Sequence, residues 1–190
     1  MARTPDPGKR VELLRAVVGH LAESGVNDLS LAPLAEAIGT SKRMLLYYFG
    51  DRGELISQVL EASRPDVGKI FDGVNTRDQL AESAMQLWHA LTRGDQRHSV
   101  RMLLQVLSLA ATDPGTYGEH ARTAVEVILT PITAAFVTTD FTPGEAAARA
   151  TLVVSGLRGL CQDLLVTNDG ERLDTAARLL VDAAVHGGSH

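Results

Sequence analysis

Apolar residues recur at helical spacing along most of this 190-residue chain, and the pattern is most distinct between residues 30 and 49. Ser30 is expected to cap a first short helix, because its hydroxyl can accept a hydrogen bond from a first-turn N–H. Pro33 lies inside that turn, where its missing backbone N–H costs little, because first-turn N–H groups have no hydrogen-bond partner within the helix. Gly39 is expected to end the helix, since glycine adopts the left-handed conformation without a Cβ penalty. The apolar face of this helix consists of Leu31, Leu34, Ala35 and Ile38.

A second short helix is predicted directly after the glycine turn. Ser41 is its expected N-cap, and Leu45 and Phe49, one turn apart, can pack back onto the first helix. Two short helices joined by a tight turn are typical of a helix-turn-helix, whose second helix enters a DNA groove. The outer face of this second helix carries two cations, a methionine and a tyrosine, namely Lys42, Arg43, Met44 and Tyr47.

Beyond residue 60 the chain continues as amphipathic helices separated by loop signals. Pro65 and the segment 68–73 are expected to end or interrupt a fourth helix. Pro131 lies inside a long apolar segment and should kink it, because proline removes a backbone donor in mid-helix. A capping box with proline at the first helical position marks the start of a helix at Thr142. The predicted helices after the fourth span 77–91, 100–111, 117–137, a segment that starts at 142, and 171–186.

Composition narrows the class of protein. Hydrophobic residues make up 45% of the chain and aromatic residues only 4%, which favours helix packing over a sheet core. Cys161 is the only cysteine, so the sequence predicts no internal disulfide, no thiolate metal cluster and a reducing, cytoplasmic setting. We expect no signal peptide, no membrane span, no metal and no cofactor. The terminal Gly-Gly-Ser-His is expected to be frayed.

From about Lys9 to Leu60 the sequence resembles the tetracycline-repressor (TetR) family of transcriptional regulators. The segment 49–55, Phe-Gly-Asp-Arg-Gly-Glu-Leu, is similar to the family's F-x-[ND]-K-x-x-L start of a fourth helix. Arg43 stands where the family often has a small residue, and Leu46 where it usually has a phosphate-binding tyrosine. The upstream match to the family's first helix comprises Leu13, Leu14, Ala16, Val17, Leu21 and a stop at Gly25, with Leu14, Val17, Val18 and Leu21 as the expected buried stripe.

The resemblance implies an all-α protein that regulates transcription. A three-helix DNA-binding domain is expected over residues 1–55, followed by a helical ligand-binding and dimerisation domain over residues 56–190. The implied partner is a palindromic double-stranded operator, from which a repressor is released by a ligand. The expected DNA contacts, with Tyr47 and Tyr48 replacing the family tyrosine, are Lys9, Ser30, Ser41, Lys42, Arg43, Met44, Tyr47, Tyr48 and Arg52.

Charge gives the DNA hypothesis limited support. The formal net charge is −5, an unfavourable sign for a partner coated in phosphate. Residues 1–55 hold seven cations and seven acids, so the excess of negative charge lies entirely outside the predicted DNA-binding domain. Lys9, Arg10 and Arg52 could equally be solvated surface charges.

The two C-terminal helices are apolar on more than one face, so they have more surface to bury than one subunit can cover. In the family resembled here the corresponding pair forms a dimer interface, and a two-fold operator also demands a dimer. The alternative is that the small-residue face at Gly156 and Gly159 packs on its own domain. The expected dimer contacts are Leu152, Gly156, Gly159, Leu173, Ala177, Leu180 and Ala184.

In the family resembled here a ligand pocket commonly lies between the middle helices and the dimer helices, so the resemblance implies a small, mostly apolar effector there. A few polar groups would fix its orientation in an apolar cavity. The opposing interpretation is that these residues are ordinary core or surface positions. The residues predicted to contact the effector are Met85, Trp88, His89, Met102, Gln105, His120, Arg158, Cys161 and Gln162.

Two other classes of protein remain open. An enzyme is disfavoured, because the chain carries no G-x-S-x-G, P-loop, G-x-G-x-x-G or H-E-x-x-H motif and its six histidines lack metal-ligand spacing. A helical adaptor that has kept the fold without specific DNA binding is the stronger alternative. Leu46 and the acidic balance are the arguments for it.

Overall fold

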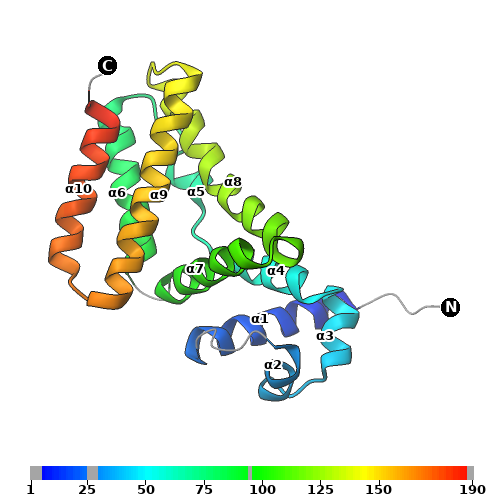
Figure 1. The fold of residues 1–190 in the computed structure, drawn as a ribbon. Coiled ribbons are helices and arrows are strands. Elements are labelled where there is room, and N and C mark those ends of the chain that lie inside the picture. Colours follow the sequence, from blue (N-terminus) through cyan, green and yellow to red (C-terminus); the bar gives the residue numbers. More distant parts are fainter. Residues whose placement is uncertain (1–5, 25–29, 94–95, 188–190) are drawn as a thin grey trace. The chain divides into compact units, whose positions relative to one another are not determined.

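Every regular element in the described part of the chain is a helix. The computed structural model describes residues 6–24, 30–93 and 96–187 (Figure 1). The all-α class expected from the sequence is therefore confirmed. The helices are α1 (Pro7–Ser24), α2 (Leu31–Ala37), α3 (Lys42–Phe49), α4 (Arg52–Ser63), α5 (Val67–Ile70), α6 (Arg77–Thr92), α7 (Gln96–Thr112), α8 (Pro114–Thr138), α9 (Pro143–Thr167) and α10 (Gly170–His186).

The predicted helices are present, with boundaries that shift by a few residues. Pro65 follows the end of α4, and the four-residue α5 is the only helix between α4 and α6. The capping box that starts α9 is formed, because Thr142 Oγ1 accepts from Glu145 N while the Glu145 carboxylate accepts from Thr142 N. Pro131 lies inside α8, as predicted. The stop expected at Gly25 and the terminal residues 188–190 lie outside the described residues.

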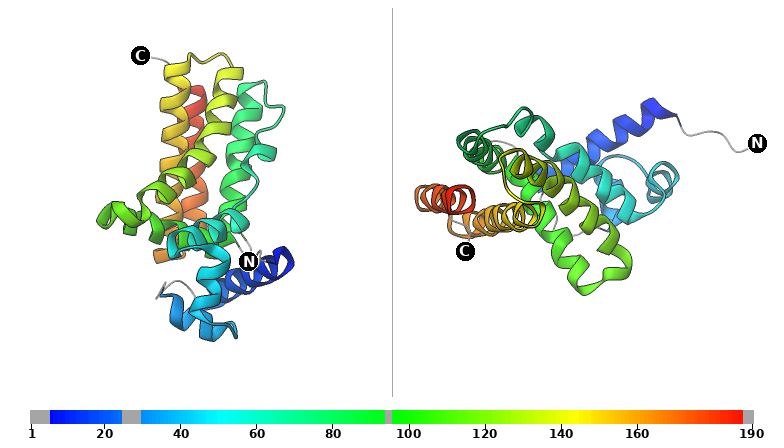
Figure 2. Two further views of the ribbon diagram at one scale, coloured as in Figure 1. Left: turned by 90° about the vertical axis from the view of Figure 1, so that its right-hand side faces the viewer. Right: turned by 90° about the horizontal axis from the view of Figure 1, so that it is seen from above.

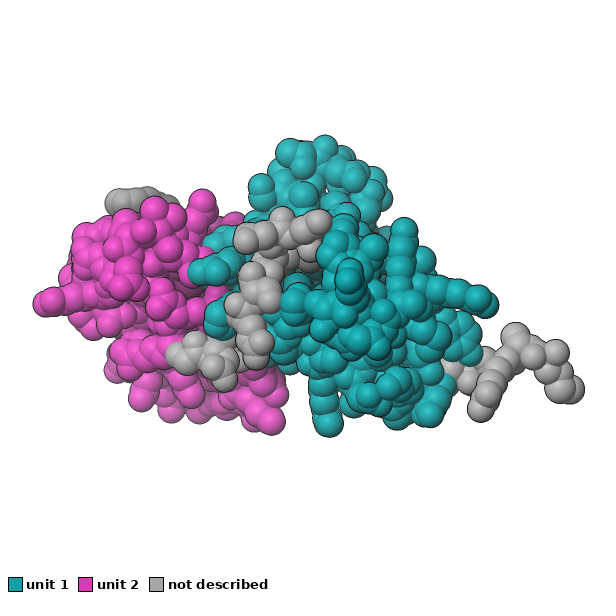
Figure 3. Space-filling view, turned by 90° about the horizontal axis from the view of Figure 1, so that it is seen from below, with its two compact units in different colours: residues 1–64, 98–124 teal, residues 65–97, 125–190 magenta. Residues whose placement is uncertain are grey.

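The chain divides into two compact units, each made of two separate stretches (Figure 3). Unit 1 comprises residues 1–64 and 98–124, so it continues well past the functional boundary predicted after residue 55. Its apolar core joins side chains of α1 to α4 with others from α7 and the first part of α8. The buried members are Leu13, Val17, Leu21, Leu31, Leu34, Ala35, Leu45, Phe49, Leu55, Ile56, Val59, Leu60, Met102, Val106, Tyr117 and Ala121. Leu13 thus belongs to the buried stripe of α1, while Leu14 and Val18 are only half-buried.

Unit 2 comprises residues 65–97 and 125–190. Helices α6, α9 and α10 contact one another pairwise, and α9 and α10 lie side by side in the views of Figures 1 and 2. A long-range bond ties two of these helices together, since Trp88 Nε1 donates to Asp174 Oδ1 at 2.6 Å. Trp88, Phe136 and Leu157 are fully buried, so the interior of this unit is a packed core.

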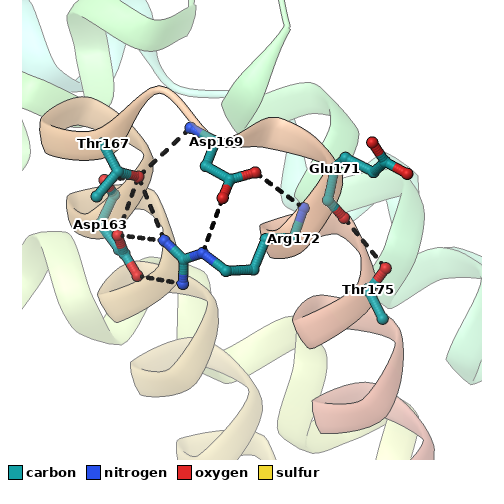
Figure 4. Close-up of polar contacts among 6 residues, drawn as sticks. All are labelled: Asp163, Thr167, Asp169, Glu171, Arg172 and Thr175. Atoms are coloured by element: carbon teal, nitrogen blue, oxygen red, sulfur yellow. Dashed lines mark hydrogen bonds and ion pairs between the residues drawn. The ribbon is translucent and has the colours of Figure 1, made fainter.

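The connection between α9 and α10 is fixed by one arginine (Figure 4). Asn168 ends α9 in the left-handed conformation with φ 55°, which asparagine tolerates better than most residues. The Arg172 guanidinium then donates to both carboxylate oxygens of Asp163, at 3.0 and 2.9 Å, and to Asp169 at 3.1 Å. These hydrogen bonds from Arg172 hold the pKa of Asp163 below its usual value. Arg172 therefore links the end of α9 to the start of α10.

Helix α8 is long and apolar enough to cross a membrane by length and composition alone. Core helices of globular proteins meet the same criterion. Ala121, Ile132, Ala135 and Phe136 of this helix are each at most 5% exposed, so part of its apolar surface is covered by protein.

Candidate nucleic-acid interface

Ser30 starts α2 by its backbone rather than by its side chain. Its backbone is extended, and its carbonyl accepts from Leu34 N at 3.4 Å. Its hydroxyl, however, accepts no capping hydrogen bond from the first turn of α2. An N-cap side chain bonds the N–H of the second or third helical residue, and the third residue here is Pro33, which has none. The predicted side-chain cap is wrong for that reason.

The turn between α2 and α3 follows the prediction. Gly39 adopts φ 69°, the left-handed conformation that only glycine enters without strain. Thr40 N then donates to Ala35 O at 2.8 Å, which satisfies a carbonyl in the last turn of α2. Ser41 caps α3, because its Oγ accepts from Met44 N at 3.2 Å. These bonds fix the direction in which α3 leaves the turn.

Helix α3 is anchored through two side chains one turn apart. Leu45 is 1% exposed and Phe49 3% exposed, and both belong to the same buried cluster as the apolar face of α2. Leu46 and Tyr48 are half-buried and pack against that cluster, so for these two residues the alternative of core packing has structural support. The rings of Tyr47 and Tyr48 meet edge to face, with centroids 5.1 Å apart.

The opposite side of α3 is open to solvent. Lys42, Arg43, Met44 and Tyr47 are all exposed, as predicted, and Met44 and Tyr47 are exposed despite being large and apolar. No carboxylate occurs between residues 40 and 49. The helix therefore presents a cationic and partly apolar surface on a rigid support.

Arg10 secures the end of α3, and the sequence pattern did not predict this role. Its Nε donates to Tyr48 O at 3.3 Å, and its Cζ lies 5.6 Å from the centre of the Phe49 ring. A cation at the C-terminus of a helix is favourable, because the last carbonyls carry partial negative charge. The contact joins α1 to α3 across 38 positions of sequence, so no local spacing could reveal it.

Two of the predicted DNA contacts, Lys9 and Arg52, have protein partners in the structure. Lys9 Nζ lies 2.7 Å from Glu12 Oε1, in an exposed pair along α1. Arg52 is half-buried, and its Cζ lies 5.7 Å from the centre of the Tyr117 ring. Its Nε is buried and has no hydrogen-bond partner within the described residues. Arg52 thus contributes to packing within unit 1, whereas its contact with DNA stays a prediction.

The sequence and the structure were each compared with known proteins. No profile of a known protein family matches the sequence, and no curated protein matches it. Solved structures do match. A transcriptional regulator from Rhodococcus sp. RHA1 aligns with TM-score 0.72 and 21% identity, over 96% of this chain and 97% of the other. A protein from Mesorhizobium loti assigned to the TetR family aligns with TM-score 0.68 and 17% identity, over 97% and 98%.

A third similar structure is NalD of Pseudomonas aeruginosa, the secondary repressor of the MexAB-OprM multidrug efflux pump. It aligns with TM-score 0.68 and 19% identity, over 96% of this chain and 97% of its own. The chain has the TetR-regulator fold. Because the coverage is nearly complete on both sides, the similarity extends over the C-terminal helices as well as the helix-turn-helix.

In this TetR-type fold three of the predicted dimer contacts are interior residues. Leu173, Ala177 and Ala184 are 0% exposed, because α10 packs against both α6 and α9. The prediction that they face a second subunit is wrong. Helix α10 is apolar on much of its circumference, and the spacing of its apolar residues does not show which of them face the interior of their own subunit.

The remaining dimer residues divide into two kinds. A Cβ on Gly156 would lie only 2.3 Å from Leu180 Cδ2, so Gly156 makes room for a side chain of its own subunit. This supports the alternative that the small-residue face packs within its domain. Gly159, in contrast, has no atom within 4 Å of where its Cβ would be, and Leu152 is 48% exposed. For these two, contact with a second subunit stays a prediction.

The nine predicted effector contacts are distributed over both compact units. Met102, Gln105 and His120 belong to unit 1, where His120 packs against Gly53. Met85, Trp88, His89, Arg158, Cys161 and Gln162 belong to unit 2. Effector binding at these nine positions stays a prediction.

Several of these side chains already have structural roles. Trp88 is fully buried and bonded to Asp174, and Arg158 donates to Ser155 Oγ at 3.3 Å. Cys161 is 2% exposed, and burial raises the pKa of its thiol to about 12.

Proposed function

We propose that this protein is a DNA-binding transcriptional regulator of the TetR family, in which α3 enters the major groove. The observation that carries the proposal is the two-sided character of α3. Leu45 and Phe49 fix one side in the core of unit 1, while Lys42, Arg43, Met44 and Tyr47 are exposed on the rest of the helix. A rigid helix with exposed cations at its N-terminal end is what a helix-turn-helix brings to DNA.

The charge distribution over the two compact units is consistent with this proposal. Unit 1 contains ten cations and ten acids, and unit 2 contains eight cations and 13 acids, so the whole excess of −5 belongs to unit 2. A DNA-binding unit with no net charge and only local groups of cations gains little from non-specific attraction to the phosphates. Its affinity must therefore depend on contacts made by particular side chains.

We also infer that the protein acts as a homodimer on a palindromic operator. Leu152, Val166 and Leu179 are exposed at 48%, 81% and 68% on the paired helices α9 and α10, which is unfavourable unless another surface covers them. Light scattering should show a dimer at micromolar concentration, and Gly159→Arg should convert it to a folded monomer. A wild-type chain that runs as a monomer would contradict the dimer.

The proposal has four further parts. The protein represses transcription, is released from DNA by a small apolar effector, is located in the cytoplasm and has no enzymatic activity. The similar fold of NalD, a repressor, supports the regulatory part. These finer features follow from the proposed family and not from one side chain of this protein.

Fluorescence anisotropy with DNA from upstream of the protein's own gene, against a scrambled duplex, tests DNA binding. Arg43→Ala should weaken specific binding by about 1 to 3 kcal/mol and relax the preference at one base pair. Lys9→Ala is the matched control, since the Lys9 side chain is 43% exposed and is predicted to lie near the DNA backbone. It should weaken both duplexes alike and reduce the salt slope by about one unit.

Equal losses on both duplexes for Arg43→Ala would reduce Arg43 to a phosphate contact. A folded wild-type protein that binds neither duplex, nor any enriched from a random pool, would instead favour the helical adaptor.

A further inference from the structure

Only a few side chains of α3 point away from the protein. Arg43 and Tyr47 lie one helical turn apart, with Met44 beside them, on the side opposite Leu45 and Phe49. Arg43 and Met44 also belong to the first turn of α3, the part of a recognition helix that reaches base edges. Lys42 precedes Leu45 by three positions, so its register is nearer the buried side, but it is exposed at the first position of α3, where we place it against the DNA backbone.

This outward face offers hydrogen-bond donors and apolar surface, and almost no acceptors. Arginine only donates, and the methionine thioether is at most a weak acceptor. Residues 41–49 are all described, and none of them carries a carboxylate or a carboxamide. The only side-chain oxygens in this segment are the hydroxyls of Ser41, Tyr47 and Tyr48. Tyr48 is half-buried and packs against the core, and Ser41 Oγ already accepts from Met44 N.

The four bases differ in what they require of such a surface. In the major groove guanine presents two acceptors, N7 and O6, and thymine presents the acceptor O4 with a methyl group. Adenine presents the acceptor N7 beside an amine, and cytosine presents an amine alone. Recognition of either amine needs an acceptor such as Asn, Gln, Asp or Glu. A surface without those residue types can recognise guanine and thymine, and it leaves the amines of adenine and cytosine without a partner.

On the basis of the proposed function, we infer that each operator half-site is recognised through a guanine and a thymine at neighbouring base pairs. Arg43 donates to N7 and O6 of the guanine, and Met44 contacts the 5-methyl group of the thymine. The two residues are consecutive at the start of α3, so they reach adjacent steps of the duplex. Adenine and cytosine amines contribute nothing to specificity at these two positions.

Selection of duplexes from a random library by the full-length protein gives the first test. The enriched half-site should contain guanine and thymine at neighbouring positions. Two base analogues then remove single groups from that site. Replacing the thymine by uracil removes only the methyl group and should weaken binding about fourfold. Replacing the guanine by 7-deazaguanine removes the N7 acceptor and should weaken binding on the order of tenfold.

Variants of the two exposed residues assign each effect to its side chain. Arg43→Ala should abolish the effect of 7-deazaguanine and keep that of uracil, and Met44→Ala should do the reverse. Met44→Gln, nearly the same size, should change the selected base from thymine to adenine, because a carboxamide bonds adenine N6 and N7 together. Met44→Leu is the matched control and should keep both thymine and the uracil effect.

Two further controls separate specificity from affinity. Lys42→Ala should weaken all duplexes without changing the selected sequence. Tyr47→Phe should leave that sequence unchanged, since the inference assigns no base to the hydroxyl. Selection of adenine or cytosine at the two positions, or analogue effects that persist in Arg43→Ala and Met44→Ala, would overturn the inference while specific DNA binding stands. A folded protein that enriches no sequence and binds no duplex would overturn the proposed function as well.

Discussion

The glycines of α9 offer a direct comparison of inward and outward positions on one helix. Gly156→Ala puts a Cβ 2.3 Å from Leu180 Cδ2 and 2.9 Å from its Cδ1, so Leu180 has to move. Overpacking of this kind costs about 1 to 3 kcal/mol. Alanine regains up to about 1 kcal/mol of helix propensity, which leaves a net loss of stability of about 0 to 2 kcal/mol. Gly159→Ala meets no atom within 4 Å and keeps only the propensity gain.

The expected difference between the two variants is therefore about 1 to 3 kcal/mol, or roughly 2 to 12 °C in Tm for a chain of this size. Circular dichroism melts at two protein concentrations measure it. Both concentrations are needed because dimerisation would make Tm concentration-dependent, and Gly159 is a predicted dimer contact. Equal melting temperatures for the two variants at both concentrations would refute the packing of Leu180 against Gly156.

Three further predictions concern unit 2. Burial and the pKa of about 12 should make Cys161 unreactive towards iodoacetamide at pH 8 in the native protein and reactive in urea, as mass spectrometry of the alkylated chain would show. Because the folded state lowers the pKa of Asp163, its ion pair with Arg172 should stabilise the protein above the unfolded pKa of 3.8 and lose that effect as pH falls through the lower, folded value. The Tm difference between wild type and Asp163→Asn should accordingly be constant from pH 5 to 7 and shrink towards pH 3. Trp88→Phe should lower the free energy of unfolding in urea by about 2 to 4 kcal/mol, since it removes buried volume and the bond to Asp174, and an unchanged midpoint would contradict that role.

Local signals in the sequence predicted the helix-turn-helix well. The glycine turn, the Ser41 cap and the alternation of buried and exposed positions in α3 each depend on residues within one or two turns of one another. Spacing and propensity are sufficient for such features. The side-chain cap predicted for Ser30 is absent, because Pro33 occupies a position whose N–H such a cap would need.

Features that depend on distant residues could not be predicted in the same way. A pattern of apolar positions shows that a helix has a buried face, but it does not name the helix that covers it. Leu173 and Ala177 were for this reason expected at a dimer interface, although they fill the core of unit 2. The bond from Trp88 to Asp174 spans 86 positions, and Arg52 meets Tyr117 from a distant part of the chain.

The discontinuous make-up of unit 1 limits how the protein could be rebuilt. Met102, Val106, Tyr117 and Ala121 complete its buried core, yet they follow the loop at Pro65, which ends α4. A chimaera that fuses the segment before this loop to another protein would contain the helix-turn-helix but lack four of the side chains that fill its core. The transplantable module of this protein is accordingly more than its N-terminal helices, because α7 and the beginning of α8 must be transferred with them, or the host must supply helices of matching shape.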